Sequence, residues 1–282
     1  MASLGVVGLG LIGGTLARRM VNNGEAPLVF DLKSEAVESA AADGAIATHS
    51  SRELAGQCDT VLVCVQTDDE CVAAISGENG VLEGARPGTC VAVHSTVMPA
   101  TILSLAAQAS DRGVQLVDSP LAGRGMFSVE EGSMTALVGD EGDIAARLEP
   151  TLRHFSSRIV RAGGLGSGAA LKLAHNVVVY AGFAATVEAV ELSHAAGVRE
   201  GLLEEVATAS GALSDLGAMY MQYYKHFRDD PHTAGEDEAL RVAAALLEKD
   251  LSDAVALAES CGTSLPVARL LSHAGAKVFP VD

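Results

Sequence analysis

The sequence predicts an α/β fold: an N-terminal doubly wound, mostly parallel sheet followed by an all-α domain that opens with a long buried helix. Three observations support this. Short β-branched runs alternate with helix-like stretches up to about residue 163, the β pattern then stops, and one long apolar helix follows. At 282 residues, the length also favours two domains, given about 150 residues per domain.

The predicted strands are short apolar runs, as expected for a sheet covered on both faces. They are Gly5–Val7, Leu28–Phe30, Val61–Val65, Cys90–Val93, Val114–Val117 and Ala136–Val138. The intervening helices are expected at Gly14–Asn23, Ser34–Ala42, Asp68–Ser76, Ala100–Arg112 and Ile144–His154. The domain boundary is placed between residues 163 and 164, in a glycine-rich link, giving domains 1–163 and 164–282.

The second domain is expected to contain helices only. Ala169–Ala196 has few charges and no proline, and at 1.5 Å per residue it would be about 42 Å long. It is apolar on more than one face, so we expect burial on most sides, partly against a second copy in a homodimer or homotetramer. The other expected helices are Arg199–Ser210, Asp215–Phe227, Glu236–Cys261 and Pro266–Lys277, with a loop at Arg228–Gly235.

Composition excludes several classes of function. Nineteen basic and 36 acidic residues give a net charge of −17, which disfavours nucleic acids and anionic membranes as partners. Five cysteines without a CxxC pair indicate reduced, mostly buried thiols, and no metal site is expected. The chain lacks the basic start of a signal peptide, and no apolar stretch reaches the roughly 20 residues that span a bilayer. We therefore expect a soluble cytoplasmic protein.

The first predicted strand runs into a GxGxxG motif at a strand-to-helix turn. In such a Rossmann-type turn the first glycine allows the bend, the second lets a pyrophosphate approach, and the third lets helix and strand pack closely. The helix N-terminus adds partial positive charge for the phosphates. The expected phosphate-binding residues are Gly8, Leu9, Gly10, Leu11, Ile12 and Gly13.

An acid at the end of the second strand favours NAD over NADP as the cofactor. Asp31 stands where a carboxylate accepts hydrogen bonds from the adenine ribose, with Leu32 next to it. The carboxylate would repel a 2′-phosphate, although Lys33 is close enough to leave NADP open as the less favoured cofactor.

Lys172 and Asn176 are four residues apart on the long helix and share one face. A lysine in an apolar helix is costly to bury without a partner or a purpose, and burial lowers its pKa toward the range useful for proton transfer. The spacing alone leaves open a surface lysine at the exposed start of the helix.

The order of these and further motifs resembles that of the β-hydroxyacid dehydrogenase family, which includes 3-hydroxyisobutyrate and 6-phosphogluconate dehydrogenases. The resemblance covers nearly the whole chain and depends on four motifs in order. They are Gly8–Gly13, Asp118–Gly125 (DSPLAGRG), Gly166–Asn176 and Lys249–Leu251, and His94–Thr96 matches a further segment.

The resemblance implies an NAD-dependent oxidoreductase that interconverts a small β-hydroxy acid and its aldehyde or ketone. Lys172 would be the general acid/base, Asn176 would hold the substrate, and Gly123 would offer its amide to the substrate acid. Ser95 would lie beside the substrate and the nicotinamide. The resemblance also implies four residues near the cofactor: Val65, Gln66, Thr96 and Lys249.

Two departures from the family loop bear on the substrate. Ala122 replaces a serine and so removes one hydroxyl contact, and Arg124 replaces a glycine. Arginine can hold a carboxylate or sulfonate with two parallel hydrogen bonds, so we expect Arg124 to take over as the anion holder. An orientation toward solvent is the alternative.

Two other functions remain open. An imine reductase on the same scaffold is one, although those relatives usually lack the lysine found at 172. A non-catalytic dinucleotide-binding module is the other, and the intact Lys172, Asn176 and Lys249 argue against it.

Overall fold

The computed structural model describes residues 4–140, 142–229 and 232–281. Its contacts divide the chain into two compact units, Met1–Lys172 and Leu173–Asp282. The division falls later than the expected boundary between 163 and 164. The start of the long helix contributes to the core of the first unit, where Ala169 is 1% exposed.

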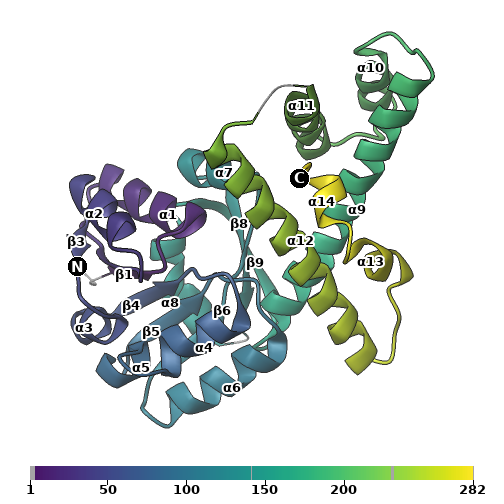
Figure 1. The fold of residues 1–282 in the computed structure, drawn as a ribbon. Helices are drawn as coiled ribbons and strands as arrows, with labels where there is room; N and C mark the ends of the chain where they lie inside the picture. The colour runs from purple at the N-terminus through teal and green to yellow at the C-terminus, as the bar shows by residue number, and fades with distance from the viewer. Residues whose placement is uncertain (1–3, 141, 230–231, 282) are drawn as a thin grey trace. The chain divides into compact units, whose positions relative to one another are not determined.

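The first unit contains a six-stranded parallel sheet in the order β3-β2-β1-β4-β5-β6 (Figure 1). Strands β2 and β3 are added on one side of β1, and β4, β5 and β6 on the other, so the strand order reverses at β1. A ligand crevice opens at the carboxyl ends of the strands at such a switch point. The strands are β1 (Leu4–Val7), β2 (Leu28–Phe30), β3 (Ile46–Ala47), β4 (Thr60–Val63), β5 (Cys90–Val93) and β6 (Gln115–Asp118).

A separate three-stranded sheet, β7-β8-β9, corrects one expectation. The run Ala136–Val138 belongs to β8 (Met134–Gly139), which pairs antiparallel with β7 (Leu121–Ala122) and parallel with β9 (Ser156–Gly163) instead of joining the main sheet. The sequence did not predict β9, because serine and arginine interrupt its apolar pattern. It also missed β3 and β7, which have two residues each and therefore too little periodicity to detect.

Two apolar cores cover the two faces of the main sheet. One packs Leu16 and Met20 of α1 with Leu148 of α8, and the other packs Leu54 of α3 with Ile102 of α6. Predicted helices are present at every expected place, and α3, α5 and α7 are additional short ones. The bounds are α1 (Leu11–Asn22), α2 (Ser34–Ala42), α3 (Ser51–Gln57), α4 (Asp68–Ser76), α5 (Val81–Gly84), α6 (Pro99–Ser110), α7 (Met126–Glu131) and α8 (Ile144–Leu152).

The described residues of the second unit form helices and loops only, as predicted. Phe183 of the long helix stacks on Tyr220 with ring centroids 3.9 Å apart, which is a contact between two helices. The expected loop Arg228–Gly235 is shorter, since a capping box of Thr233 and Glu236 starts α12 at Ala234; residues 230–231 lie outside the described residues. The expected Pro266–Lys277 helix is two short ones. The bounds are α9 (Ser167–Ala195), α10 (Leu202–Ala209), α11 (Asp215–Asp229), α12 (Ala234–Ser260), α13 (Pro266–Leu271) and α14 (Gly275–Val278).

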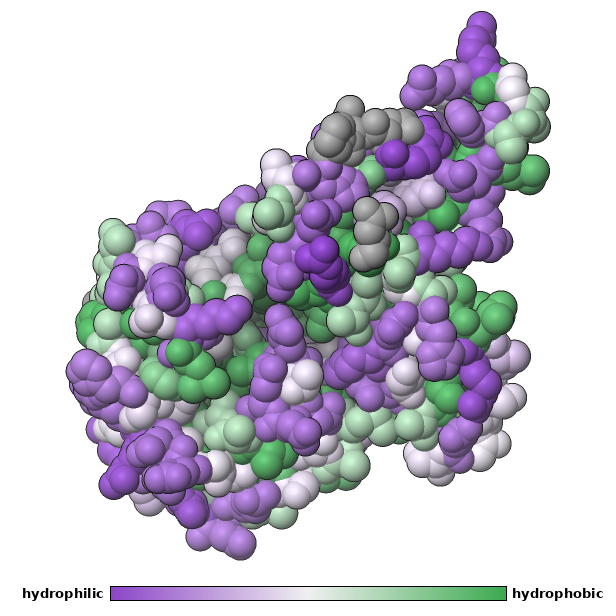
Figure 2. Space-filling model, viewed as in Figure 1, coloured by the Kyte–Doolittle hydropathy of each residue, from purple (hydrophilic) through white to green (hydrophobic). Residues whose placement is uncertain are grey.

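A single chain leaves part of the long helix α9 exposed. Val178 is 73% and Leu192 71% exposed, so one chain does not bury this helix on most sides. Among the described residues α9 is also the one helix whose length and composition would allow it to cross a membrane, which corrects the expectation that no stretch is long enough. Figure 2 shows further apolar surface over α10 and α13, where Val206 and Leu270 are exposed.

Candidate active site

The glycine turn after β1 has two positions that packing requires. Gly8 has φ +88°, a left-handed conformation, and a Cβ there would lie 2.5 Å from the carbonyl oxygen of Cys64. A Cβ on Gly13 would overlap the carbonyl oxygen of Gly8. These two glycines therefore allow the turn and the close packing of α1 on the sheet.

Gly10 differs from both, because a Cβ at this position would meet nothing within 4 Å. No packing contact among the described residues accounts for a glycine here. It directly precedes the N-terminus of α1, where unpaired amide hydrogens favour an anion. The open space fits the close approach of a pyrophosphate, as the motif predicts.

Asp31 joins the glycine turn to the end of β2. Its Oδ2 accepts a hydrogen bond from the Leu9 amide at 2.6 Å and its Oδ1 one from the Lys33 amide at 2.8 Å. The carboxylate is thus fixed beside the turn, where the ribose of a dinucleotide is expected. The adjacent Leu32 is 93% exposed, which leaves an apolar side chain available to the adenine.

The ends of β4 and β5 are linked through Ser95. The Ser95 hydroxyl oxygen accepts a hydrogen bond from the Val65 amide at 2.9 Å, so these two predicted residues lie together. Thr96 follows and is half-buried, whereas Gln66 is exposed and its amide donates to Glu70. Ser95 therefore helps to hold the ends of β4 and β5 together, and its hydroxyl group can also donate a hydrogen bond.

His94 has a structural role that the sequence did not indicate. It is 7% exposed, and its Nδ1 lies 2.6 Å from the carbonyl oxygen of Ser119, an arrangement that requires the Nδ1–H tautomer. Burial lowers the pKa of His94 to about 4, so the ring is neutral at physiological pH. It links β5 to the segment that leads into the predicted substrate loop.

In the substrate loop, Ala122 is buried and Gly123 is exposed. A Cβ on Gly123 would lie 2.6 Å from the Met134 sulfur and 2.8 Å from the Ser128 Cβ, so packing alone disfavours a side chain here. The Arg124 side chain is 42% exposed, and its Nη2 lies 2.6 Å from Oε2 of Glu131. The guanidinium therefore already binds a carboxylate, a partner that the sequence analysis did not foresee.

Lys172 and Asn176 are one turn apart on α9, at the end of the first unit and the beginning of the second. Lys172 is half-buried and Asn176 is 5% exposed. In the second unit, the Asn176 Nδ2 donates to Asp250 Oδ2 at 2.6 Å. The amide is thereby oriented, and its Oδ1 lies 3.2 Å from Nδ1 of the neighbouring His175. A carbonyl oxygen has two lone pairs, so Oδ1 can accept a second hydrogen bond from a hydroxyl group.

Asp250 is a buried acid whose part in this site was not predicted. Tyr180 also donates to it, at 3.3 Å, and Lys249 lies 3.4 Å away. Burial, together with the Asp250 charge, raises the pKa of Tyr180 well above its ordinary value, so the phenol stays a donor. Lys249 also pairs with Asp253 at 3.1 Å. The Lys249–Leu251 motif was the available signal, since Asp250 is its central residue.

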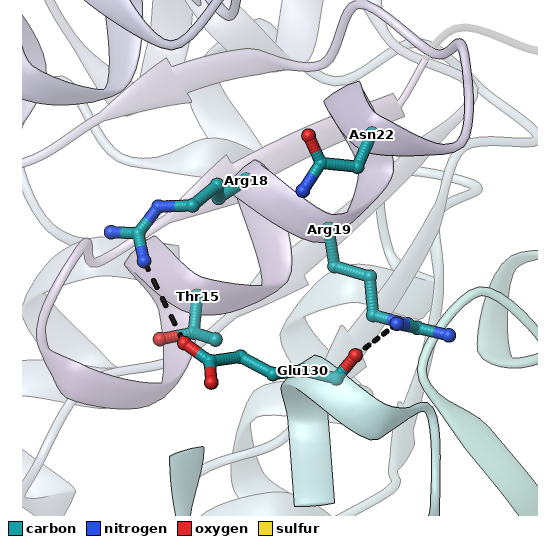
Figure 3. A pocket seen from close by; sticks show the side chains of 5 residues that line it. All are labelled: Thr15, Arg18, Arg19, Asn22 and Glu130. Atoms are coloured by element: carbon teal, nitrogen blue, oxygen red, sulfur yellow. Dashed lines mark hydrogen bonds and ion pairs between the residues drawn. The ribbon is translucent and has the colours of Figure 1, made fainter. Parts of the chain in front are cut away.

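A hollow of about 250 Å³ lies between α1 and α7, and none of the predicted site residues lines it. Figure 3 shows that Arg18 points to the Glu130 carboxylate, and that Arg19 donates to the Glu130 backbone carbonyl. Both guanidinium groups thus have protein partners, so this hollow is not a vacant anion site. In the part of the chain that the structure describes, no three potential metal ligands gather.

Comparison with known proteins identifies the family. Residues 3–164 match the model of the NAD-binding domain of 6-phosphogluconate dehydrogenase. Residues 166–278 match that described as NAD-binding of NADP-dependent 3-hydroxyisobutyrate dehydrogenase. The chain belongs to the β-hydroxyacid dehydrogenase family. It is an NAD(P)-binding oxidoreductase, as the motifs predict.

Relatives of this dehydrogenase cover almost its whole length. An uncharacterized oxidoreductase of Mycobacterium tuberculosis is 31% identical over 95% of this chain and 90% of its own. An NAD-dependent L-serine dehydrogenase of Pseudomonas aeruginosa is 27% identical over 96% and 90%. The crystal structure of 3-hydroxyisobutyrate dehydrogenase from Salmonella typhimurium has a TM-score of 0.85 at 26% identity, covering 98% and 94%.

Proposed function

We propose that this dehydrogenase uses NAD to oxidise a small β-hydroxy acid, or a related acid-bearing alcohol, to the aldehyde or ketone, or catalyses the reverse reaction. The observation that carries the proposal is the pair Lys172 and Asn176, one turn apart on α9, with the amide of Asn176 oriented by Asp250. The pair provides a proton-transfer group and a hydroxyl-binding group at the correct spacing.

The residues of the first unit fit a dinucleotide, and Asp31 favours NAD. The cofactor would be held at the Gly8–Gly13 turn, with its ribose at Asp31, and Val65, Gln66 and Thr96 beyond it. A 2′-phosphate would meet the fixed carboxylate of Asp31, an unfavourable contact that the Lys33 side chain has to offset for NADP to bind. The resemblance adds Ser95 and Lys249 at the nicotinamide end.

The chain's own groups then supply acid–base chemistry. The bound nicotinamide supplies the hydride-accepting carbon. Lys172, as the neutral amine, accepts the proton of the substrate hydroxyl, and in the reverse direction the ammonium returns it to the forming alkoxide. Asn176 keeps the hydroxyl oxygen within reach of this amine.

The substrate acid would be held by the loop around Arg124. Gly123 offers its amide, while Ala122 removes the usual hydroxyl contact, so the guanidinium becomes the main binding group. The pair of Arg124 with Glu131 is half-exposed, and such pairs contribute little. A substrate carboxylate can therefore replace Glu131 at small cost.

An NADH-formation assay tests the proposal. Small 3-hydroxy acids, a sulfonate analogue and simple alcohols are offered with NAD and with NADP, alongside Lys172→Ala. We expect turnover with NAD and a hydroxy acid, and at least a hundredfold loss in the variant, the upper range for general acid–base catalysis being about 10⁴-fold. Turnover that survives Lys172→Ala would contradict the proposal. If no substrate of the panel is turned over while NADH still binds, the imine reductase reaction is favoured. Imine reductases share this fold: the structure of one from Pseudomonas has a TM-score of 0.67 at 19% identity.

We also propose a cytoplasmic homodimer or homotetramer. The exposed Val178 and Leu192 on α9 leave an apolar surface that a second copy would cover. The buried thiols of Cys58 and Cys90 fit a reducing compartment. A monomer mass by light scattering at micromolar concentration would contradict the assembly.

A further inference from the structure

Asp118 is a buried acid that the proposed reaction does not use directly. It is the last residue of β6 and is 0% exposed. Its Oδ1 accepts a hydrogen bond from the Gly166 amide at 2.8 Å, and its Oδ2 one from the Ala169 amide at 2.7 Å. Helix α9 begins between these residues, so a strand residue satisfies amide hydrogens that a helix N-terminus leaves without a partner.

Two glycines form the slot that holds this carboxylate. A Cβ on Gly139, the last residue of β8, would overlap both Asp118 oxygens. A Cβ on Gly168 would overlap the Leu137 carbonyl and lie 2.8 Å from Asp118 Oδ2. The ends of β6 and β8 and the first turn of α9 thus meet at one point, and no side chain fits between them.

The hydrogen bonds favour the ionised form of this acid. Each oxygen receives an amide hydrogen, so protonation of either oxygen would direct a hydroxyl hydrogen at an N–H donor. Burial raises the pKa of Asp118, and the backbone amides of Gly166, Gly168 and Ala169 oppose that rise. A negative charge at a helix N-terminus is also favoured by the helix dipole.

Lys172 lies one turn beyond this joint. It follows Ala169 by three residues, about 4.5 Å along the helix axis. Helical side chains lean toward the N-terminus, so the lysine leans toward the capped turn. We propose that Asp118 is a positioning residue for Lys172: its carboxylate fixes the first turn of α9 and so the place from which the amine reaches the substrate. The inference depends on the proposed role of Lys172.

Asp118→Asn tests the inference, with Asp140→Asn as a matched control. Asp140 accepts the Gly142 and Ala145 amides at 2.9 Å each at the start of α8, a helix that carries none of the proposed site residues. For Asp118→Asn we expect kcat to fall at least about tenfold with the NADH Kd changed less than twofold. Because a negative charge near the ammonium is lost, the pH–rate limb assigned to Lys172 should move about half a unit to one unit lower. Asp140→Asn should leave kcat and the limb within error.

Ala169→Pro separates placement from charge. It removes the Ala169 donor and puts the ring Cδ where the amide hydrogen meets Asp118 Oδ2, so the carboxylate keeps its charge but is displaced from the first turn. This variant should lower kcat without moving the pH–rate limb assigned to Lys172. It replaces Asp118→Asn if circular dichroism shows that Asp118→Asn does not fold. The inference would be overturned if folded Asp118→Asn and folded Ala169→Pro both kept the wild-type kcat. It would also be overturned if kcat fell equally in Asp118→Asn and Asp140→Asn. Wild-type turnover in Lys172→Ala would instead overturn the proposed function.

Discussion

Removing the Arg124 guanidinium should weaken the binding of acid substrates without affecting the cofactor. Arg124→Ala loses a charge-assisted interaction with the substrate acid, which is worth about 1.5–3 kcal/mol. At 1.4 kcal/mol per factor of ten, KM for a hydroxy acid should rise roughly 10- to 150-fold. The side chain is 42% exposed, so solvent screening places the expected value toward the lower end of that range.

Glu131→Gln provides the opposite perturbation. It removes the carboxylate that competes for Arg124, and an exposed pair of this kind contributes at most about 1 kcal/mol, so KM should fall by no more than about fivefold. Ser133 also donates to Glu131 at 3.0 Å, and the neutral amide can keep that contact. The loop should therefore keep its conformation in this variant.

Initial rates with a hydroxy acid and with an uncharged alcohol of the same length separate binding of the acid from general damage. Arg124→Ala should raise KM for the acid only, with the NADH Kd unchanged by fluorescence titration. Equal KM changes for both substrates, or none for the acid, would refute the assignment and would leave Arg124 as a surface partner of Glu131.

Three further predictions concern packing and titration. Gly13→Ala should unfold readily, because its Cβ overlaps a backbone carbonyl. Gly10→Ala should keep its melting temperature and bind NADH at least about tenfold more weakly. The reverse order in thermal shift and NADH titration would exclude phosphate binding at this turn. The lowered pKa of His94 means that the unfolded chain binds a proton first, so the unfolding free energy should fall as pH drops from 6.5 to 4, by about 3 kcal/mol in total. Urea titrations of His94→Asn should lack that part of the slope, and identical slopes would contradict the burial effect. Burial raises the pKa of Cys58 and Cys64 to about 12, so a thiol reagent at pH 8 should label the exposed Cys261 in the native protein, and fast labelling of more than one thiol would disagree.

The main sheet could be predicted because its strands are continuous apolar runs between helices with clear ends. Leu28–Phe30 and Cys90–Val93 agree residue for residue with β2 and β5. The second sheet could not be predicted in this way, since β7 has two residues and β9 begins with three polar residues and carries an arginine at position 161. Their pairing with β8 is a tertiary contact that a local pattern does not contain.

The candidate site was only partly accessible to sequence reasoning. The motifs identified Lys172, Asn176 and the glycine turn, whose residue types are fixed by local chemistry. The groups that orient them are distant in sequence: Asp250 lies 74 residues from Asn176. The sequence marks Asp250 as part of the Lys249–Leu251 motif, but its pairing with Asn176 is a tertiary contact that follows from the fold.

The glycine turn shows why a motif match alone is weak evidence for cofactor binding. Gly8 and Gly13 are required by the packing of α1 on β1 and β4, so a chain with this fold would keep them even without a ligand. Gly10 has no such packing reason, since space is open where its side chain would be. Asp31 beside the same turn accepts one backbone amide hydrogen on each carboxylate oxygen, and each oxygen can accept a further hydrogen bond from a ligand hydroxyl. The functional information therefore lies above all in Gly10, which packing does not require, and a variant at this position separates the loss of the ligand from the loss of the fold.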